Sequence, residues 1–394
     1  MRFALLGTHP DGIDMACALA EGGRHELVAY TSAEPVPESV LRRWGPQARR
    51  LHDLEDLLAD PAIEAVIVAG TPANRTVQLR RALQSERHVM CVYPPDSVPD
   101  GAYEAAMIRN DTGRVLLPLL PEALHPGVVR LAEVVRSGGR PLVEPRLIEV
   151  ERWGEGPVLL DTGGHRPAIP GWDVLRALGG EVAEVSALAA REEVSPEEPV
   201  LVSGRFERGP LFQAALVPYQ NEARWRVVAV GSHGRAELLF PVGPRGPAFL
   251  SWRDAAGELH EEAWDAWDPW PVLATLFEEA VADPAPRSAR RLTWQDAVRC
   301  LELDDAARRS AHKRRASTME YQEASEEVGF KGTMTLVGCG IVWLIIVIII
   351  VANWFPRAGW AVVPLLLVFL GLQAFRWIVP RQRPTTPGGS ANRR

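Results

Sequence analysis

The chain has 394 residues, a formal net charge of −7 at pH 7 and a hydrophobic fraction of 47%. This length allows two domains with sizeable cores, and the acidic balance argues against nucleic acid as a partner. No CxxC spacing occurs among Cys17, Cys91, Cys300 and Cys339, which argues against a zinc site and against a disulfide framework.

Strands alternate with helices along the first 119 residues. The expected strands span 2–6, 27–31, 66–69, 88–93 and 115–119, and the expected helices span 13–21, 73–85 and 103–110, with weaker elements up to residue 60. This alternation predicts a doubly wound parallel sheet, whose ligands bind at the carboxyl ends of the strands. We therefore predict a Rossmann-like nucleotide-binding domain over residues 1–119.

Residues 120–315 have a different pattern. A helix ending at Gly138 and Gly139 comes first, and seven strand-like runs follow at short spacing. Several runs are separated only by turn residues, so they are expected to pair as antiparallel hairpins. Helices are expected over 172–178, 271–282 and 294–309. The pattern predicts an α+β domain with an open antiparallel sheet covered by helices on one face.

Two long uncharged stretches, 332–356 and 358–375, lie near the end of the chain. Each can cross a hydrocarbon core about 30 Å thick, which needs roughly 20 residues of helix. We predict transmembrane helices over 334–354 and 358–378, with a polar linker over 316–333 before them and a disordered tail over 379–394. The alternative is a pair of buried core helices.

Basic residues flank the two expected spans, whereas their short turn holds only Arg357. This distribution places both termini and the soluble domains in the cytoplasm. The apolar start, Met1–Leu6, is too short for a signal peptide and fits a strand better. The predicted location is the cell membrane, with two spans. Gly338 and Gly340 leave open that the pair of helices binds a partner or oligomerises.

The loop after the first expected strand reads Gly7-Thr8-His9-Pro10-Asp11-Gly12. A dinucleotide-binding fold places G-x-G-x-x-G here, and only the outer two glycines are present. The middle glycine normally lets the backbone approach a pyrophosphate, and His9 puts a side chain there. A helix N-terminus follows, which can hold an anion. Gly7, Thr8, His9 and Gly12 are therefore candidate cofactor-binding residues, unless the pocket has lost its cofactor.

Thr31 and Ser32 end the second expected strand, where an acidic residue would hold a ribose 2′-hydroxyl. They are candidate cofactor-binding residues, and Glu34 is the nearest acid. Without an acid there is room for a 2′-phosphate, which Arg42 or Arg43 could approach. The choice between NAD and NADP stays open.

Five segments occur in a fixed order: LLADPAIEAVIVAGTP, HVMCVYPP, HPGVVRLAEVVRSGG, LLDTGGH and TWQDAVRCLELDDAARRSA. Because of these segments and their order, roughly the first 315 residues resemble the Gfo/Idh/MocA oxidoreductases, a family named from glucose-fructose oxidoreductase and inositol dehydrogenase. The resemblance implies a Rossmann domain paired with a substrate and dimerisation domain, a bound NAD or NADP, and hydride transfer to or from sugar-like alcohols. The two expected spans are not part of the usual family pattern.

The resemblance also implies site residues. Tyr93 stands where the family has a lysine; a phenol can exchange a proton or donate a hydrogen bond but carries no positive charge. The family's aspartate, followed four residues later by a histidine, is matched by Asp161 and His165. In this interpretation His165 exchanges the hydroxyl proton, Asp161 tunes the site, and the nicotinamide lies near Thr71, Pro72 and Tyr93.

Departures from the family pattern leave structural alternatives open. The family's aspartate three residues after the histidine is displaced here, by RPAIPGW, to Asp173. His165 can instead cap a turn, Asp161 can be a helix N-cap or a turn residue, and Tyr93 can be a packing residue.

Other residues allow two interpretations. One group consists of three tryptophans, Trp264, Trp267 and Trp270. They can form a stacking platform for a sugar ring, although packing in the core or in a dimer interface is favoured. Arg75 can contact a phosphate or be a solvated helix residue.

These observations predict a membrane-anchored NAD(P)-dependent oxidoreductase acting on a sugar- or polyol-like alcohol. The alternative is a catalytically degenerate, nucleotide-binding sensor or scaffold tethered to the membrane. The expected partners are a small sugar-like substrate and the lipid bilayer. The substrate's identity and a homo-oligomer are left open.

Overall fold

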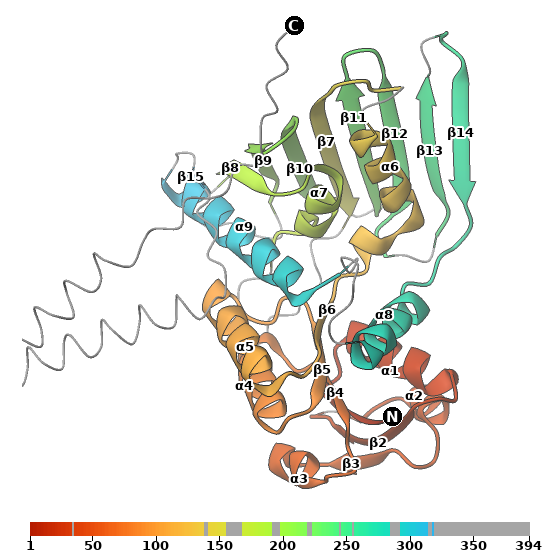
Figure 1. The fold of residues 1–394 in the computed structure, drawn as a ribbon, viewed down its shortest axis with the longest axis vertical. Coiled ribbons are helices and arrows are strands. Elements are labelled where there is room, and N and C mark those ends of the chain that lie inside the picture. Colours follow the sequence, from red (N-terminus) through yellow and green to blue (C-terminus); the bar gives the residue numbers. More distant parts are fainter. Residues whose placement is uncertain are drawn as a thin grey trace, which may run out of the picture. The chain divides into compact units, whose positions relative to one another are not determined.

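The computed structural model of the protein describes residues 1–33, 35–137, 141–154, 168–190, 198–218, 223–243, 246–253, 256–283, 292–313 and 317–318. All of them lie in one compact unit, residues 1–322. They form two β-sheets with helices packed against them (Figure 1).

The first sheet has six strands in the order β3-β2-β1-β4-β5-β6, and all of its pairings are parallel. The strands are β1 (Arg2–Leu6), β2 (Glu26–Thr31), β3 (Arg49–Leu51), β4 (Ala65–Val68), β5 (His88–Val92) and β6 (Leu116–Leu119). The order reverses between β1 and β4, where a doubly wound fold opens a crevice for its ligand. The predicted Rossmann-like parallel sheet is confirmed.

Helices cover both faces of this sheet. They are α1 (Pro10–Glu21), α2 (Glu38–Trp44), α3 (Leu54–Ala59), α4 (Pro72–Gln84) and α5 (Pro99–Thr112). α4 packs beside α5 on one face, while α1 and α2 lie on the other (Figure 1). Because both faces are covered, β4 is buried at every residue, which accounts for its continuous apolar sequence.

The second sheet has nine strands in the order β14-β13-β12-β11-β7-β10-β9-β8-β15. Their bounds are β7 (Pro145–Gly154), β8 (Val182–Ala189), β9 (Val200–Phe206), β10 (Leu211–Pro218), β11 (Arg224–Gly231), β12 (Arg235–Pro241), β13 (Ala248–Arg253), β14 (Leu259–Trp264) and β15 (Ser317–Thr318). The sequence pattern does not indicate β14, because its LHEEAW sequence is mostly polar.

The expectation of a purely antiparallel second sheet was wrong, because β7 pairs with β10 in parallel. Every other neighbouring pair is antiparallel, including β7 with β11. β10 and β11 therefore run in opposite directions on either side of β7. A strand between two such neighbours must be parallel to one of them, so the sheet is mixed.

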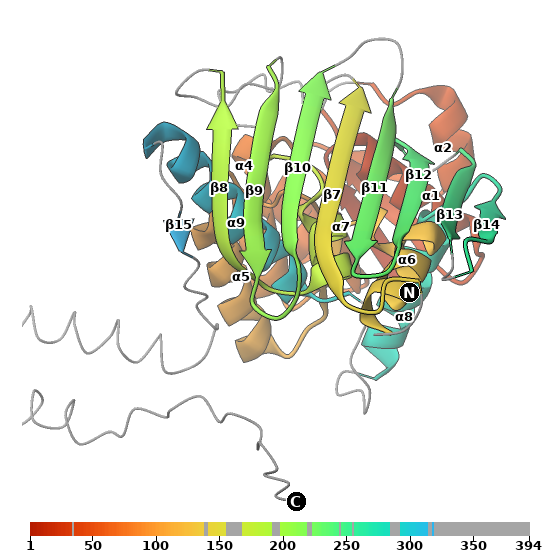
Figure 2. The ribbon, with the colours of Figure 1, turned by 90° about the horizontal axis from the view of Figure 1, so that it is seen from above.

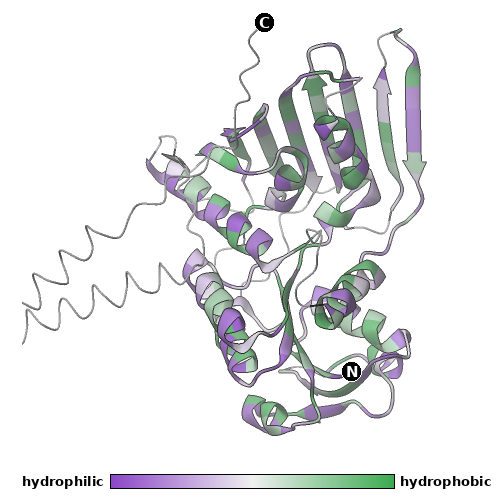
Figure 3. Ribbon diagram, viewed as in Figure 1, coloured by the Kyte–Doolittle hydropathy of each residue, from purple (hydrophilic) through white to green (hydrophobic). Residues whose placement is uncertain are grey.

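Helices cover one face of the second sheet: α6 (Pro126–Arg136), α7 (Trp172–Gly179) and α9 (Trp294–Lys313) (Figure 2). The strands alternate between buried and exposed residues, as in β9, and bands of both hydropathy classes run along them in Figure 3. This period of two is expected for a sheet with one covered face. Two further elements, η1 (Glu122–Leu124) and α8 (Trp270–Ala282), complete the fold, and α8 packs on α1.

The predicted linker, spans and tail occupy residues 316–394, and the two spans and the tail lie wholly outside the described residues. Within the part of the chain that the structure describes, no helix is both long and apolar enough to cross a membrane.

Candidate functional site

The loop between β1 and α1 is built around two glycines. Gly7 has a φ of +96°, and a Cβ on it would lie 2.3 Å from the carbonyl oxygen of Ala69. A Cβ on Gly12 would lie 2.2 Å from the Cβ of Ala69. Both positions therefore require glycine: the first for the turn, the second for close packing of α1 on the end of β4. These are the steric roles of the outer glycines in a dinucleotide-binding loop.

His9 closes the start of α1 with its own side chain. Its backbone N–H donates to Ala69 O at 3.0 Å, and its Nδ1 accepts from Asp11 N at 3.3 Å. Pro10, the first helical residue, has no N–H to offer. The helix start therefore presents fewer free donors than an ordinary dinucleotide loop does.

Burial controls the charges beside this helix start. It lowers the pKa of His9 to about 4, with help from the positive charge of Arg75, so His9 is neutral at physiological pH. Burial, together with the charge of Asp14, raises the pKa of Asp11 to about 6, and Arg75 opposes that rise. Thr8 lies between Gly7 and His9 and is partly buried.

Arg75 is fully buried, so the interpretation of it as a solvated helix residue was wrong. Its guanidinium donates to Gly70 O at 2.9 and 3.2 Å and also to Pro94 O. Arg75 thus ties the segment after β4 to the segment after β5. Sequence alone could not place it, because the burial depends on how the two strand ends pack.

Thr71 and Pro72 begin α4 directly after β4; Thr71 is the N-cap and its side chain makes no capping bond. β4 neighbours β1, with Leu6 in register with Val68. The loop before α1 and the start of α4 are therefore adjacent at the same edge of the sheet, as the prediction of a shared cofactor site requires.

Thr31 and Ser32 lie at the carboxyl end of β2. The carbonyl of Thr31 accepts from Gly7 N at 3.0 Å, and that of Ser32 accepts from Arg50 Nη2 at 2.8 Å. Arg43 donates to Glu21 at 2.6 Å, so its charge already has a partner on α1. Glu34 lies outside the described residues.

Tyr93 follows β5 and precedes Pro94 across a cis peptide bond. Its hydroxyl oxygen is buried and has no hydrogen-bond partner in the described structure, and its ring packs against the core of the second sheet. Burial raises its pKa well above the ordinary value, with smaller contributions from Cys300 and Asp304. A phenol is protonated at neutral pH even without this shift, so the chemistry of Tyr93 is that of a hydrogen-bond donor.

The carboxyl group of Asp173 acts electrostatically on this hydroxyl, and Glu122 interacts in turn with Asp173. Asp173, in the first turn of α7, accepts from Ala123 N at 3.0 Å, and burial raises its pKa. Burial and the neighbouring Asp173 raise the pKa of Glu122 to about 8, against the charge of Arg152. The sequence pattern does not single out Glu122; its only signal is its position just after the last parallel strand.

The predicted pair Asp161 and His165 lies in 155–167, outside the described residues. The described chain stops at Gly154, the end of β7, and resumes at Ala168, four residues before α7. These two assignments stay predictions.

The three tryptophans have packing partners. Trp264 packs against the core of the second sheet, and Trp270 is buried at the start of α8. Trp267 meets the ring of His125 edge-on at a centroid distance of 5.2 Å. These contacts agree with the favoured packing interpretation.

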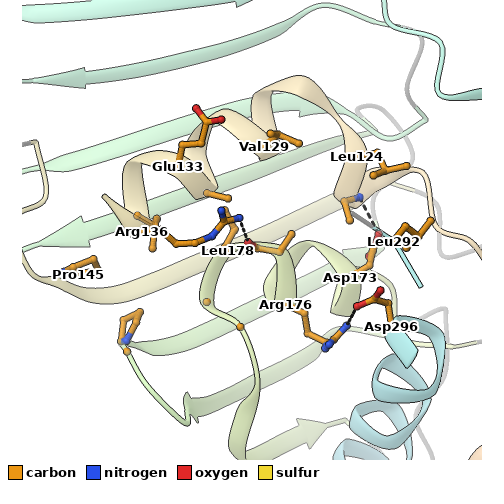
Figure 4. Close-up of a pocket in the computed structure, with 18 of the residues that line it drawn as sticks. Leu124, Val129, Glu133, Arg136, Pro145, Asp173, Arg176, Leu178, Leu292 and Asp296 are labelled. Carbon is orange, nitrogen blue, oxygen red and sulfur yellow. Dashed lines mark hydrogen bonds and ion pairs between the residues drawn. The ribbon is translucent and has the colours of Figure 1, made fainter. Parts of the chain in front are cut away.

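A cavity of about 850 Å³ lies between α6 and α7. Asp173 lies at the η1 end of this cavity, and Arg136 and Pro145 at the opposite end (Figure 4). Its described wall includes none of the residues of the loop before α1. Among the described residues no group of three His, Cys, Asp or Glu side chains is placed to hold a metal ion.

The sequence and the fold were compared with those of known proteins. No family model matches the chain. It is 27% identical over 276 residues to inositol 2-dehydrogenase of Mycolicibacterium gilvum, covering 64% of this chain and 75% of the relative. It is 26% identical over 137 residues to D-xylose 1-dehydrogenase (NADP(+)) 2 of Haloferax volcanii, covering 35% of this chain and 42% of that protein.

Solved structures agree over most of the described part. GenD2 from gentamicin A biosynthesis, in complex with NAD, has a TM-score of 0.66 at 20% identity, covering 82% of this chain and 97% of GenD2. Levoglucosan dehydrogenase, in complex with NADH and levoglucosan, has a TM-score of 0.66 at 15% identity, covering 82% of this chain and 100% of that one. The chain therefore has the fold of the Gfo/Idh/MocA-type, inositol dehydrogenase-like NAD-dependent oxidoreductases.

Proposed function

We propose that this protein is an NAD(P)-dependent dehydrogenase that acts on a CH–OH group of a sugar- or polyol-like substrate. The observation that carries the proposal is the buried Tyr93 hydroxyl, which has no partner in the described structure and lies at the carboxyl end of β5, in the same parallel sheet as the glycine loop. Relatives named inositol 2-dehydrogenase and D-xylose 1-dehydrogenase support the substrate class.

The chain's residues fit a dinucleotide in most respects. Gly7 and Gly12 provide the turn and the close helix packing that the fold requires, and Thr71 and Pro72 border the same edge. A bound nicotinamide would supply the hydride donor or acceptor. The departure is at the start of α1, where His9 stands in place of the middle glycine and accepts from Asp11 N, and where Asp11 adds a carboxyl group.

In this proposal Tyr93 donates a hydrogen bond to the reacting oxygen of the substrate. The donor role follows because a phenol is protonated at neutral pH, and burial raises its pKa further. His165 exchanges the proton of the substrate hydroxyl and Asp161 orients and tunes it, as the resemblance implies. The charge of Asp173 acts on the Tyr93 hydroxyl and on Glu122, so these two carboxyl groups belong to the electrostatic surroundings of that donor.

The decisive experiment is cofactor binding followed by turnover. The full-length protein is titrated with NADH and with NADPH while its tryptophan fluorescence is followed, and is then assayed with NAD+ and with NADP+ against a panel of sugars and polyols. We expect saturable binding and reduction of the cofactor by at least one polyol. Absence of binding up to millimolar concentration would refute the proposal.

A second candidate is a nucleotide-binding sensor or scaffold without catalytic activity. It is favoured by Pro10 and Asp11 at the helix start and by tyrosine in place of the family's lysine. This candidate would be favoured over the dehydrogenase if the cofactor binds saturably but no panel substrate is turned over. In that case His165→Ala should leave the cofactor affinity unchanged.

Attachment to the cytoplasmic side of the cell membrane is a separate proposal, supported by the two uncharged stretches of the sequence. We expect the full-length protein to stay in the membrane fraction after alkaline carbonate extraction. A variant lacking residues 332–378 should be released, and release of the full-length protein would refute the anchor.

A further inference from the structure

Arg50 occupies the position beside the expected ribose site. It lies on β3, in register with Tyr30 of β2. Its Nη2 donates to Ser32 O at 2.8 Å and to Ala33 O at 3.4 Å. These carbonyls follow the end of β2, where a doubly wound fold places the adenosine ribose.

The guanidinium of Arg50 retains binding capacity. A guanidinium has N–H donors on three nitrogens, and the hydrogen bonds of Arg50 to described residues use Nη2 alone. Arg50 has no carboxylate partner within the described residues, and its side chain is exposed. Its Nε and Nη1 donors are therefore available to an anion.

The surrounding residues favour a phosphate over a bare hydroxyl. Thr31, Ser32 and Ala33 supply no carboxylate to accept from a ribose 2′-hydroxyl. Of the two arginines that the sequence suggested, Arg43 is engaged by Glu21 at 2.6 Å. The cation that contacts this strand end is Arg50, which donates to the carbonyls of Ser32 and Ala33 and arrives from a different strand.

We propose that Arg50 is the specificity-determining residue of the cofactor site and makes the protein prefer NADP(H) to NAD(H), by pairing with the 2′-phosphate. This inference rests on the proposed function and deepens it. The chemistry is a charge-assisted hydrogen bond between guanidinium and phosphate, which is stronger than a neutral one.

Binding of the isolated nucleotide halves measures this contact directly. Adenosine 2′,5′-bisphosphate and 5′-ADP are titrated by calorimetry into the full-length protein, and NADPH and NADH are compared by fluorescence. We expect the 2′-phosphorylated member of each pair to bind about 10- to 100-fold more tightly, the range that charged hydrogen bonds give.

Three substitutions separate Arg50 from general surface charge. Arg50→Gln should remove that preference and leave NADH affinity within about twofold. Arg49→Gln is the matched control, because it removes the same charge from the adjacent residue, whose guanidinium lies 4.0 Å from the carboxylate of Asp60. The preference of this variant for NADPH over NADH should be unchanged. Ser32→Asp should shift the preference toward NADH, because the new carboxylate accepts from the ribose hydroxyl, repels the phosphate and pairs with Arg50.

The outcomes are distinct. Tighter NADPH binding that is lost in Arg50→Gln and kept in Arg49→Gln supports the assignment. The assignment is overturned if NADH binds at least as tightly as NADPH. It is also overturned if Arg50→Gln and Arg49→Gln lower the affinity for NADPH equally. Either result leaves the proposed function standing. Failure of both cofactors to bind overturns the proposed function itself, and this inference with it.

Discussion

Single side chains at the candidate site are held in states that folding alone does not favour. The Tyr93 hydroxyl is buried without a partner in the described structure, and leaving a polar atom in this state costs about 1–3 kcal/mol. Contact with a substrate oxygen would compensate for that cost when the substrate binds. The same reasoning makes Tyr93 the residue whose role is easiest to test.

Tyr93→Phe should keep or slightly raise the free energy of unfolding, by up to about 2 kcal/mol, because it removes the unpartnered hydroxyl. Turnover should fall about 100-fold through loss of the donor. Urea denaturation and kcat measure the two effects. The matched control is Tyr103→Phe: its hydroxyl donates to Glu302, so this change should lower stability and leave kcat unchanged. An unaltered kcat in Tyr93→Phe would mark Tyr93 as a packing residue.

Asp11 predicts a pH dependence of cofactor binding. Its pKa is raised to about 6, so it becomes neutral below that pH and negatively charged above it. A carboxylate beside the pyrophosphate repels it, so the affinity for NADH should fall as the pH rises from about 5 to about 7.5. His9 does not contribute, since its pKa of about 4 keeps it neutral over this range. Titrations at several pH values should show the effect, and Asp11→Asn should abolish it; an equal slope in that variant contradicts the assignment.

At the scale of elements, the contact of α1 with the end of β4 positions the glycine loop. It depends on Gly12 lying directly over Ala69, where the space for a methyl group is already filled. A side chain there would push the helix away from the sheet and displace the helix start at the expected cofactor site.

Gly12→Ala should therefore destabilise the fold by about 1–3 kcal/mol, the usual cost of overpacking, and weaken cofactor binding. Denaturant unfolding and fluorescence titration measure both. Gly22→Ala, at the other end of α1, is the control, because a Cβ there meets nothing closer than 3.6 Å. Adding Ala69→Gly to Gly12→Ala should restore part of the stability; strictly additive losses would show that this contact is not the cause.

At the scale of the whole described unit, the second sheet has one face covered by helices and one without them (Figure 2). Exposed apolar side chains occur on its strands, among them Leu201 and Leu211, which are 51% and 56% exposed. They come from neighbouring strands, since β9 pairs with β10. A surface of this kind favours association with a second copy of the chain.

We predict a homo-oligomer formed through this face. Leu201→Lys combined with Leu211→Lys should lower the molar mass measured by light scattering in detergent and leave the fold intact, because both side chains are exposed. The control is Val77→Lys, which changes an equally exposed residue, 51%, on α4 of the other sheet. A monomeric starting protein would contradict the prediction.

Local patterns account for the parts of the fold that could be predicted. The alternation of buried strands with helices indicated the parallel sheet, and the turn residues indicated most hairpins of the second. The parallel pairing of β7 with β10 could not be predicted, because it joins strands more than fifty residues apart through tertiary packing. The polar β14 was missed for a similar reason: it pairs with β13 without an apolar signal of its own.

The sequence by itself determined the glycine positions of the loop, the order of elements and the resemblance that names Tyr93, since these depend on neighbours along the chain. Only the tertiary structure decided that Arg75 is buried between two strand ends, that Glu122 and Asp173 interact electrostatically, and that Arg50 contacts the end of β2 while Arg43 pairs with Glu21. Burial and charge pairing depend on which strands are neighbours in space, and that arrangement is set by the packing of the whole sheet.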